Sequence, residues 1–189
     1  MLSVGLVLLA IYMLVLPLWP HISLWWDKRN DTTGGFTYQS RLIETPDEGA
    51  PPPKPIPQDN RLVLPTLQLD EEVHEGNGSW VLSEGLWRRP HTSTPDKGGN
   101  TVIVGHRFTY DDPSVFFHLD KIEVGDKFPL YWEGVEYNYE VTEVKVVSAL
   151  AIEVEDQTDE PTLTLYTCTP IWTSRDRLVI VSQLIEEQI

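Results

Sequence analysis

The sequence predicts an all-β domain, a closed or nearly closed barrel with short helices, behind an apolar N-terminal segment. Short runs of β-branched and aromatic residues recur from residue 61 onward, and turns rich in Gly, Asn and Asp separate them. Residues 84–88 and 114–119 alone resemble short helical turns, and no internal repeat is visible. Many short strands between turns are typical of a barrel. The predicted strands cover residues 62–69, 80–82, 101–106, 127–132, 135–147, 162–168 and 177–184.

The N-terminal segment predicts a membrane anchor. Residues 2–19 are almost wholly apolar and carry no charge, and about 18 to 20 such residues cross a bilayer as a helix. Trp19, Trp25 and Trp26 follow where an interfacial aromatic belt would lie. A cleaved signal peptide is the alternative, but no basic segment precedes the run and no small-residue cleavage site follows it. We therefore predict an uncleaved transmembrane helix over residues 1–26, in contact with the lipid bilayer.

The stretch from residue 27 to residue 60 predicts a linker. It has no sustained period and becomes Pro-rich at residues 51–57, PPPKPIP. Such a segment is a semi-extended spacer, although a ligand for a proline-binding module is an alternative reading. The remaining residues, 61–189, form the predicted β domain. The chain has 29 acidic and 14 basic residues, a net charge of −15, so it would repel phosphates, and no nucleic-acid partner is expected.

Three chemically distinct side chains stand at the ends of predicted strands. Cys168, the only cysteine, ends one run, Arg177 begins another, and His106 follows a third. A thiolate is a nucleophile, an imidazole transfers protons near neutral pH, and a guanidinium stabilises an oxyanion. Together they suggest cysteine acyl-transfer chemistry. Arg175, two residues from Arg177, is the rival for the arginine role, and the run RLVIV favours Arg177.

The same residues resemble a known family. The run TLYTC, ending at Cys168, resembles the TLxTC signature of sortases, and Arg177 at the head of RLVIV resembles the family's catalytic arginine. NTVIVGHR, residues 100–107, resembles the strand that delivers the catalytic histidine. Further similarity lies in FHLDKI with Gly125 and Asp126, and in residues 82–99 before the histidine strand. The similarity covers residues 62–184.

This resemblance implies an eight-stranded sortase-type β-barrel and a cysteine transpeptidase. Sortases cut an LPxTG-like sorting signal between Thr and Gly and transfer the acyl group to an amine. The implied catalytic residues are His106, Cys168 and Arg177, with Thr167 as a substrate-binding candidate. The implied partners are proteins with sorting signals and an amine acceptor of the cell envelope or of a pilin. No cofactor is expected.

The resemblance also carries the expected localisation. A single-pass protein of the cell membrane with an extracellular catalytic domain would attach surface proteins to the cell envelope. Lys28 and Arg29 alone would favour a cytoplasmic C-terminal side, so this orientation rests on the domain. A pilin-polymerising sortase is less expected, because such enzymes usually add a C-terminal membrane helix and an N-terminal lid with an Asp-Pro-aromatic motif. The sequence resembles classes C, D and E without separating them.

Other candidate groups have simpler interpretations. No pair of His or Cys residues has zinc-ligand spacing, and no metal is expected. Some sortases bind calcium through acids before the cysteine strand, but a solvated loop is the preferred interpretation here. Alternative functions are a catalytically idle, membrane-tethered peptide-binding β-barrel, a papain-like protease and an L,D-transpeptidase; the last two lack their characteristic cysteine motifs. The remaining histidines, without an expected role, are His21, His74, His91 and His118, and the acids of the loop are Glu153, Glu155, Asp156, Asp159 and Glu160.

Overall fold

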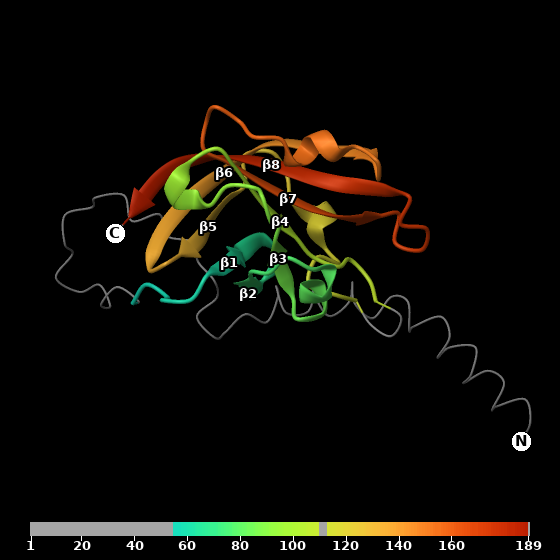
Figure 1. The fold of residues 1–189 in the computed structure, drawn as a ribbon, viewed down its shortest axis with the longest axis horizontal. Coiled ribbons are helices and arrows are strands. Elements are labelled where there is room, and N and C mark those ends of the chain that lie inside the picture. Colours follow the sequence, from blue (N-terminus) through green and yellow to red (C-terminus); the bar gives the residue numbers. More distant parts are fainter. Residues whose placement is uncertain (1–54, 110–112, 189) are drawn as a thin grey trace, which may run out of the picture. The chain divides into compact units, whose positions relative to one another are not determined.

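The computed structural model describes residues 55–109 and 113–188 (Figure 1). Within these residues, eight strands close into a barrel in the order β1-β2-β3-β4-β7-β8-β6-β5. This confirms the eight-stranded barrel. The strands are β1 (Arg61–Leu64), β2 (Leu69–His74), β3 (Leu86–Arg88), β4 (Asn100–Val104), β5 (Lys127–Trp132), β6 (Val135–Ser148), β7 (Thr162–Thr169) and β8 (Asp176–Gln188). Short 3-10 helices connect them: η2 (Pro65–Leu67), η3 (Ser79–Ser83), η4 (Pro95–Lys97), η5 (Leu119–Lys121) and η6 (Ile152–Glu155).

The predicted membrane anchor, residues 1–26, and most of the predicted linker, residues 27–60, lie outside the described residues. Both stay predictions. In the part of the chain that the structure describes, no helix is long and apolar enough to cross a bilayer.

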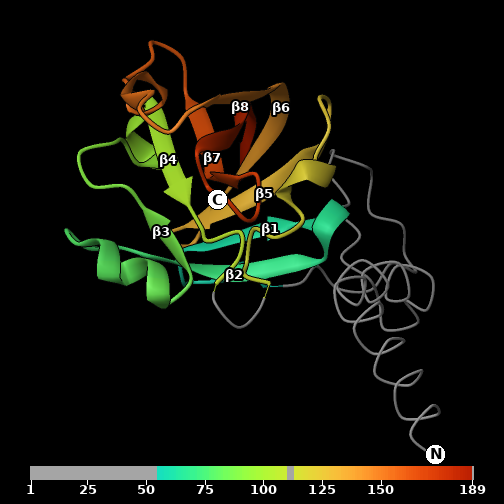
Figure 2. The same cartoon turned by 90° about the vertical axis from the view of Figure 1, so that its right-hand side faces the viewer.

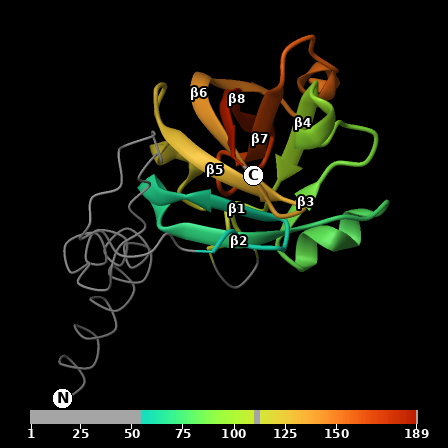
Figure 3. The same cartoon turned by 90° about the vertical axis from the view of Figure 1, so that its left-hand side faces the viewer.

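Two strands distant in sequence lie side by side in the wall that carries the candidate site. β4 and β7 pair in parallel, from Asn100 opposite Thr162 to Val104 opposite Tyr166. β8 then pairs antiparallel with the other edge of β7. Figures 2 and 3 show β4 beside β7 from two directions. The crossover between β4 and β7 contains β5, β6 and the long loops, so residues far apart along the chain meet at the same strand ends.

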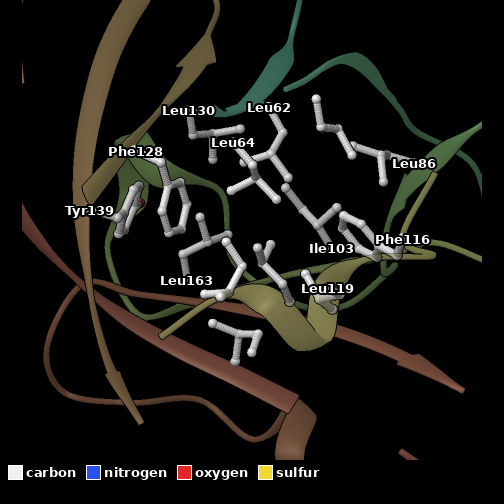
Figure 4. Close-up of a cluster of buried hydrophobic side chains, with 14 of the residues drawn as sticks. Leu62, Leu64, Leu86, Ile103, Phe116, Leu119, Phe128, Leu130, Tyr139 and Leu163 are labelled. Atoms are coloured by element: carbon white, nitrogen blue, oxygen red, sulfur yellow. The ribbon is translucent and has the colours of Figure 1, made fainter. Parts of the chain in front are cut away.

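Alternation along these strands separates the inside of the barrel from its outside. Leu163 and Leu165 of β7 and Ile103 of β4 belong to the main buried cluster, in which Ile103 lies close to Phe116 (Figure 4). Val102 and Val104 of β4 belong to a second cluster on the outer face, together with Val81 and Trp87, and Leu82 and Tyr166 pack against it. Because successive strand residues point to opposite faces, the outer face of β4 and β7 carries even-numbered residues.

The predicted strand over residues 62–69 is wrong as a single element. β1 ends at Leu64, η2 follows from Pro65 to Leu67, and β2 begins at Leu69. Pro65 lacks the N–H that would continue a ladder, and Gln68 has a φ of 53°, so the chain reverses and β2 pairs antiparallel with β1. The strand part of residues 69–74 was missed because three consecutive acids, Asp70 to Glu72, obscure its alternation.

The predictions around residue 85 are also corrected. Residues 80–82, predicted as a strand, lie within the 3-10 helix η3, and residues 86–88, part of a predicted helical turn, form strand β3. Trp87 is 3% exposed and packs in the outer cluster. Its indole Nε1 donates to the Gly76 carbonyl at 2.9 Å. Tertiary packing of this tryptophan therefore outweighs the local propensity of a short segment.

Candidate active site

Cys168 and Arg177 face each other across adjacent strands. Cys168 is the penultimate residue of β7 and is the register partner of Arg177, the second residue of β8. Side chains directly opposite in an antiparallel pair share one face of the sheet. Their neighbours Leu178 and Thr167 are buried toward the interior, which places the Cys168 and Arg177 side chains on the outer face. Both residues are half-buried.

His106 reaches the same end of the barrel along β4. The β4–β7 register ends at Val104 opposite Tyr166, and two further residues on each chain lead to His106 and Cys168. The Gly105 N–H donates to the Tyr166 carbonyl at 3.4 Å, which extends the pairing by one step. His106 is half-buried. The fold therefore brings all three predicted residues to one end of the adjoining strands β4, β7 and β8.

Gly105 allows the histidine segment to approach this closely. A Cβ atom at this position would lie 2.9 Å from side-chain atoms of Leu86, Val115 and Phe116. Contacts below 3.0 Å require a shift of the surrounding atoms, and all three neighbours are apolar side chains of the barrel end. Glycine is thus required for close approach at the residue before His106.

Thr167, the predicted substrate-binding residue, lies on the opposite face of β7 from Cys168. It is 1% exposed, and its hydroxyl donates to the Gly105 carbonyl at 2.8 Å. This bond joins the residue before Cys168 to the residue before His106. The side chain of Thr167 therefore holds the two strand ends together from within the barrel.

The two candidate arginines have different surroundings. Arg177 Nη1 donates to the carbonyl oxygens of Ser174 and Asp176, each at 3.0 Å. Arg175 lies in the β7–β8 loop with its side chain 76% exposed, and its Nε donates to Asp176 Oδ2 at 3.0 Å. Only Arg177 is in register with Cys168, so the geometry favours it for stabilising charge that develops at the cysteine.

A polar network that the sequence did not reveal lies on the outer face of β7, two residues before Cys168. The Tyr166 hydroxyl donates to Glu155 Oε1 at 2.6 Å, and Arg89 Nε donates to the same oxygen at 2.8 Å. The Arg89 guanidinium also lies 4.6 Å from the centroid of the Trp87 ring. Burial and the hydrogen bond to Glu155 raise the pKa of Tyr166, which favours the protonated phenol that donates this hydrogen bond.

This network changes the interpretation of the acidic loop. Glu155 is bound to Arg89 and Tyr166 and is only 26% exposed, so the expectation of a wholly solvated loop is wrong at this position. The other four acids of the run are exposed. Across residues 55–109 and 113–188, no cluster of three or more His, Cys, Asp or Glu is arranged to hold a metal ion.

The remaining histidines lie elsewhere. His74 Nδ1 is 4.0 Å from carboxylate oxygens of Glu72 and Glu84, and His91 is exposed in a turn with a φ of 69°. His118 packs edge-on against Phe117, with ring centroids 4.8 Å apart. His21 lies outside the described residues. None of the three described ones belongs to β4, β7 or β8.

Comparison with known proteins agrees with this arrangement. The family model described as the sortase domain matches residues 62–185. Sortase SrtE1 from Streptomyces coelicolor is 29% identical over 143 residues, which are 67% of this chain and 40% of that protein. Sortase A from Listeria monocytogenes is 28% identical over 125 residues, 65% of this chain and 54% of that protein. The chain thus spans about half the length of the curated relatives it matches.

Solved structures lead to the same family. The sortase A structure from Listeria monocytogenes matches with a TM-score of 0.61 and 25% identity, covering 68% of this chain and 88% of that one. A sortase D5 transpeptidase from Clostridium perfringens matches with a TM-score of 0.61 and 28% identity, covering 68% of this chain and 79% of that one. With the barrel topology and the match over residues 62–185, these similarities show that the chain belongs to the sortase family.

Proposed function

We propose that this protein is a cysteine transpeptidase that cleaves an LPxTG-like sorting signal between Thr and Gly and joins the acyl fragment to an amine. The observation that carries the proposal is the register of Cys168 with Arg177, next to the strand end that bears His106. A nucleophile, a proton-transfer group and a fixed cation at one site are what acyl transfer needs. Family membership supports the reaction type, because sortases are cysteine transpeptidases.

In the first half-reaction, the Cys168 thiolate attacks the carbonyl carbon of the scissile peptide bond. The carbonyl electron pair moves to oxygen, and the Arg177 guanidinium stabilises the oxyanion that forms. The C–N bond then breaks, His106 delivers a proton to the leaving Gly nitrogen, and a thioester on Cys168 remains. One imidazole can supply this proton near neutral pH.

The second half-reaction reverses these roles. An acceptor amine attacks the thioester carbon, and His106 takes the proton that the amine loses. The tetrahedral oxyanion again lies against Arg177, and its collapse breaks the C–S bond and restores the Cys168 thiolate. The new amide bond carries the energy of the peptide bond that was cut, so no external energy source enters the cycle.

The orientation of Arg177 suits it to both steps. Its Nη1 is occupied by two carbonyl oxygens of the β7–β8 turn. Among the described residues, neither Nε nor Nη2 has a hydrogen-bond partner, so both donors are available to an oxyanion or a substrate carbonyl. A guanidinium stays charged throughout the physiological range, and its position is fixed before the substrate arrives.

The biological role that we propose is the attachment of surface proteins to the cell envelope. The apolar run over residues 2–19 and the Pro-rich residues 51–57 suit a membrane-anchored enzyme whose domain extends from an extracellular surface. Pilin polymerisation is the alternative within the family. It is supported by similarity to the sortase C1 of a streptococcal pilus island, with a TM-score of 0.62 and 27% identity.

The test is a product assay with the full-length protein in detergent. The protein is incubated with a library of LPxTG-like peptides and a set of amines, namely glycine oligomers, diaminopimelate-containing peptides and lysine-bearing pilin peptides. Mass spectrometry then identifies the products. A ligated peptide supports the proposal, and the preferred amine separates envelope attachment from pilin polymerisation. A protein that binds these peptides without cleaving any would be a peptide-binding barrel.

A further inference from the structure

Arg107 follows His106 directly and is the only buried charged residue among residues 55–109 and 113–185. The residue is 8% exposed. Its Nη2 pairs with Asp120 Oδ1 at 2.9 Å, its Nη1 donates to Thr169 Oγ1 at 2.9 Å, and its Nε donates to the Phe117 carbonyl at 3.3 Å. Every nitrogen of the guanidinium is therefore bound, each to a different residue. Such a fork of fixed donors is a property that lysine lacks.

One of these bonds connects the two strand ends of the candidate site. Arg107 is the chain neighbour of His106, and Thr169 is the chain neighbour of Cys168. The β4–β7 register ends at Val104 and Tyr166, before either candidate catalytic residue is reached. Beyond that point the Thr167–Gly105 bond and the Arg107–Thr169 bond join the two segments from the side chains. The second of these bonds lies past His106 and Cys168, so the pair is enclosed between two cross-links.

Aromatic contacts strengthen the same junction. Phe108, the next residue after Arg107, packs edge-on against Trp172 of the β7–β8 loop, with centroids 4.9 Å apart. Phe108 also lies 6.2 Å from the Phe117 ring, whose carbonyl accepts from Arg107. Contacts of this kind stabilise the packing beyond the effect of the buried area alone. The chain after His106 is thus fastened to the chain after Cys168 at two successive residues.

We propose that Arg107 is a positioning residue that sets the placement of His106 relative to Cys168 through its bond to Thr169. The inference rests on the proposed roles of His106 and Cys168. Asp120 compensates the buried charge, since an unpaired buried cation is costly, while the Thr169 and Phe117 bonds fix the direction of the guanidinium. If Arg107 served only to neutralise Asp120, the bond to Thr169 would be dispensable for catalysis.

The expected effect follows from the sensitivity of acyl transfer to geometry. A misplacement of about 1 Å costs about 100-fold in rate. Thr169→Val removes the acceptor hydroxyl and keeps the side-chain shape and the Arg107–Asp120 pair. Arg107→Lys keeps the charge and loses the fork. We expect both variants to lower kcat by about 10- to 100-fold while KM changes by less than about threefold.

Arg61 provides a matched control. It also binds two partners, Asp59 Oδ2 at 2.8 Å and Asp70 Oδ1 at 2.5 Å, but it lies on β1, three strands along the barrel from β4. Arg61→Lys therefore weakens another arginine that binds two partners, at a position away from the candidate site. Its kcat should remain within about twofold of the wild-type value.

A second readout reports placement without any substrate. Cys168 is the only thiol, so iodoacetamide labels one position. A nearby imidazolium increases thiolate reactivity, and His106→Ala should slow alkylation at pH 7 in the wild-type background. The alkylation factor is the rate of alkylation with His106 divided by the rate with His106→Ala in the same background. It should fall toward one in the Thr169→Val and Arg107→Lys backgrounds and stay unchanged with Arg61→Lys. Melting temperatures of all variants check that the fold is retained.

The outcomes separate the two proposals. If the wild-type protein forms no transpeptidation product but the alkylation factor shrinks as expected, the proposed function fails and the positioning role stands. If product forms and Thr169→Val matches wild type in both kcat and alkylation factor, the positioning role is overturned while the function stands. An alkylation factor of one already in the wild-type protein would also overturn it, because His106 and Cys168 would then not be held together.

Discussion

Replacing Arg177 with lysine tests whether the guanidinium, rather than a positive charge, is what the site requires. Arg177 Nη1 donates hydrogen bonds to the Ser174 and Asp176 carbonyl oxygens, at 3.0 Å each. This anchors the group and leaves its other N–H donors for substrate. A lysine has one ammonium on a flexible stem. The ammonium can hydrogen-bond to the two carbonyl oxygens or to the oxyanion, but it cannot do both with fixed geometry.

The expected loss of turnover follows from the loss of hydrogen-bond donors to the oxyanion. Removing a single donor of this kind typically costs about 10²–10³-fold in turnover, or about 2.7–4 kcal/mol. We therefore expect Arg177→Lys to lose about 100-fold or more in kcat. Stability should change little, because the residue is half-buried at the start of β8.

Arg175→Lys is the matched control, since Arg175 is two residues away and its side chain is 76% exposed. The two variants are assayed side by side on one peptide and one amine, with product formation followed by mass spectrometry. Arg175→Lys should retain most of its activity. If Arg175→Lys proves inactive and Arg177→Lys nearly normal, the assignment of the oxyanion-stabilising arginine is wrong, and the register of Cys168 with Arg177 has no catalytic meaning.

Three further predictions concern His106, Tyr166 and the N-terminal segment. His106→Ala should lower kcat/KM by about 10²–10⁴-fold, as expected for the loss of general acid–base help, and steady-state kinetics that match wild type would remove His106 from the mechanism. Tyr166→Phe should lower the free energy of unfolding at pH 7 by about 1.5–3 kcal/mol, the usual range for a hydrogen bond to a charged group. Because the folded-state pKa of Tyr166 is raised, its stabilisation is complete below the ordinary tyrosine value and is lost as pH rises through the folded value, so urea titrations of wild type and Tyr166→Phe should converge at high pH; a gap that widens with alkali would contradict this. Residues 1–26 should remain on the mature protein. An intact mass that matches a chain beginning near Asp27 would instead indicate a cleaved signal peptide.

The long, alternating strands were predictable from sequence because their pattern is strong. Residues 127–132 coincide with β5, and the runs over 135–147 and 162–168 differ from β6 and β7 by a single residue. The errors lie where local composition and tertiary pairing disagree. β2 carries Asp70, Glu71 and Glu72 between the buried Leu69 and Val73, and β3 has only three residues, too few for a period to show.

The residue types of the candidate site were predictable from the sequence, but the contacts that hold these residues in place were not. Cys168, His106 and Arg177 each stand at a strand end that the sequence marks by alternation, and the TLYTC run adds the family resemblance. The supporting contacts depend on which loops meet. Glu155 and Arg89 are 66 residues apart, and Arg107 and Thr169 are 62 apart. A charged residue three positions after a buried strand, as Arg107 is after β4, was the one local signal of such a contact.

We propose that Cys168 forms a covalent acyl-enzyme at a site shared with His106 and Arg177. The most direct test is the intact mass of the full-length protein in detergent, incubated with a reactive sorting-signal peptide and no acceptor amine, then quenched in acid. We predict a mass gain equal to the peptide fragment that ends at Thr, mapped to Cys168 by proteolysis and absent from Cys168→Ala. Product formed with no adduct on Cys168, or an adduct that persists in Cys168→Ala, would contradict the account.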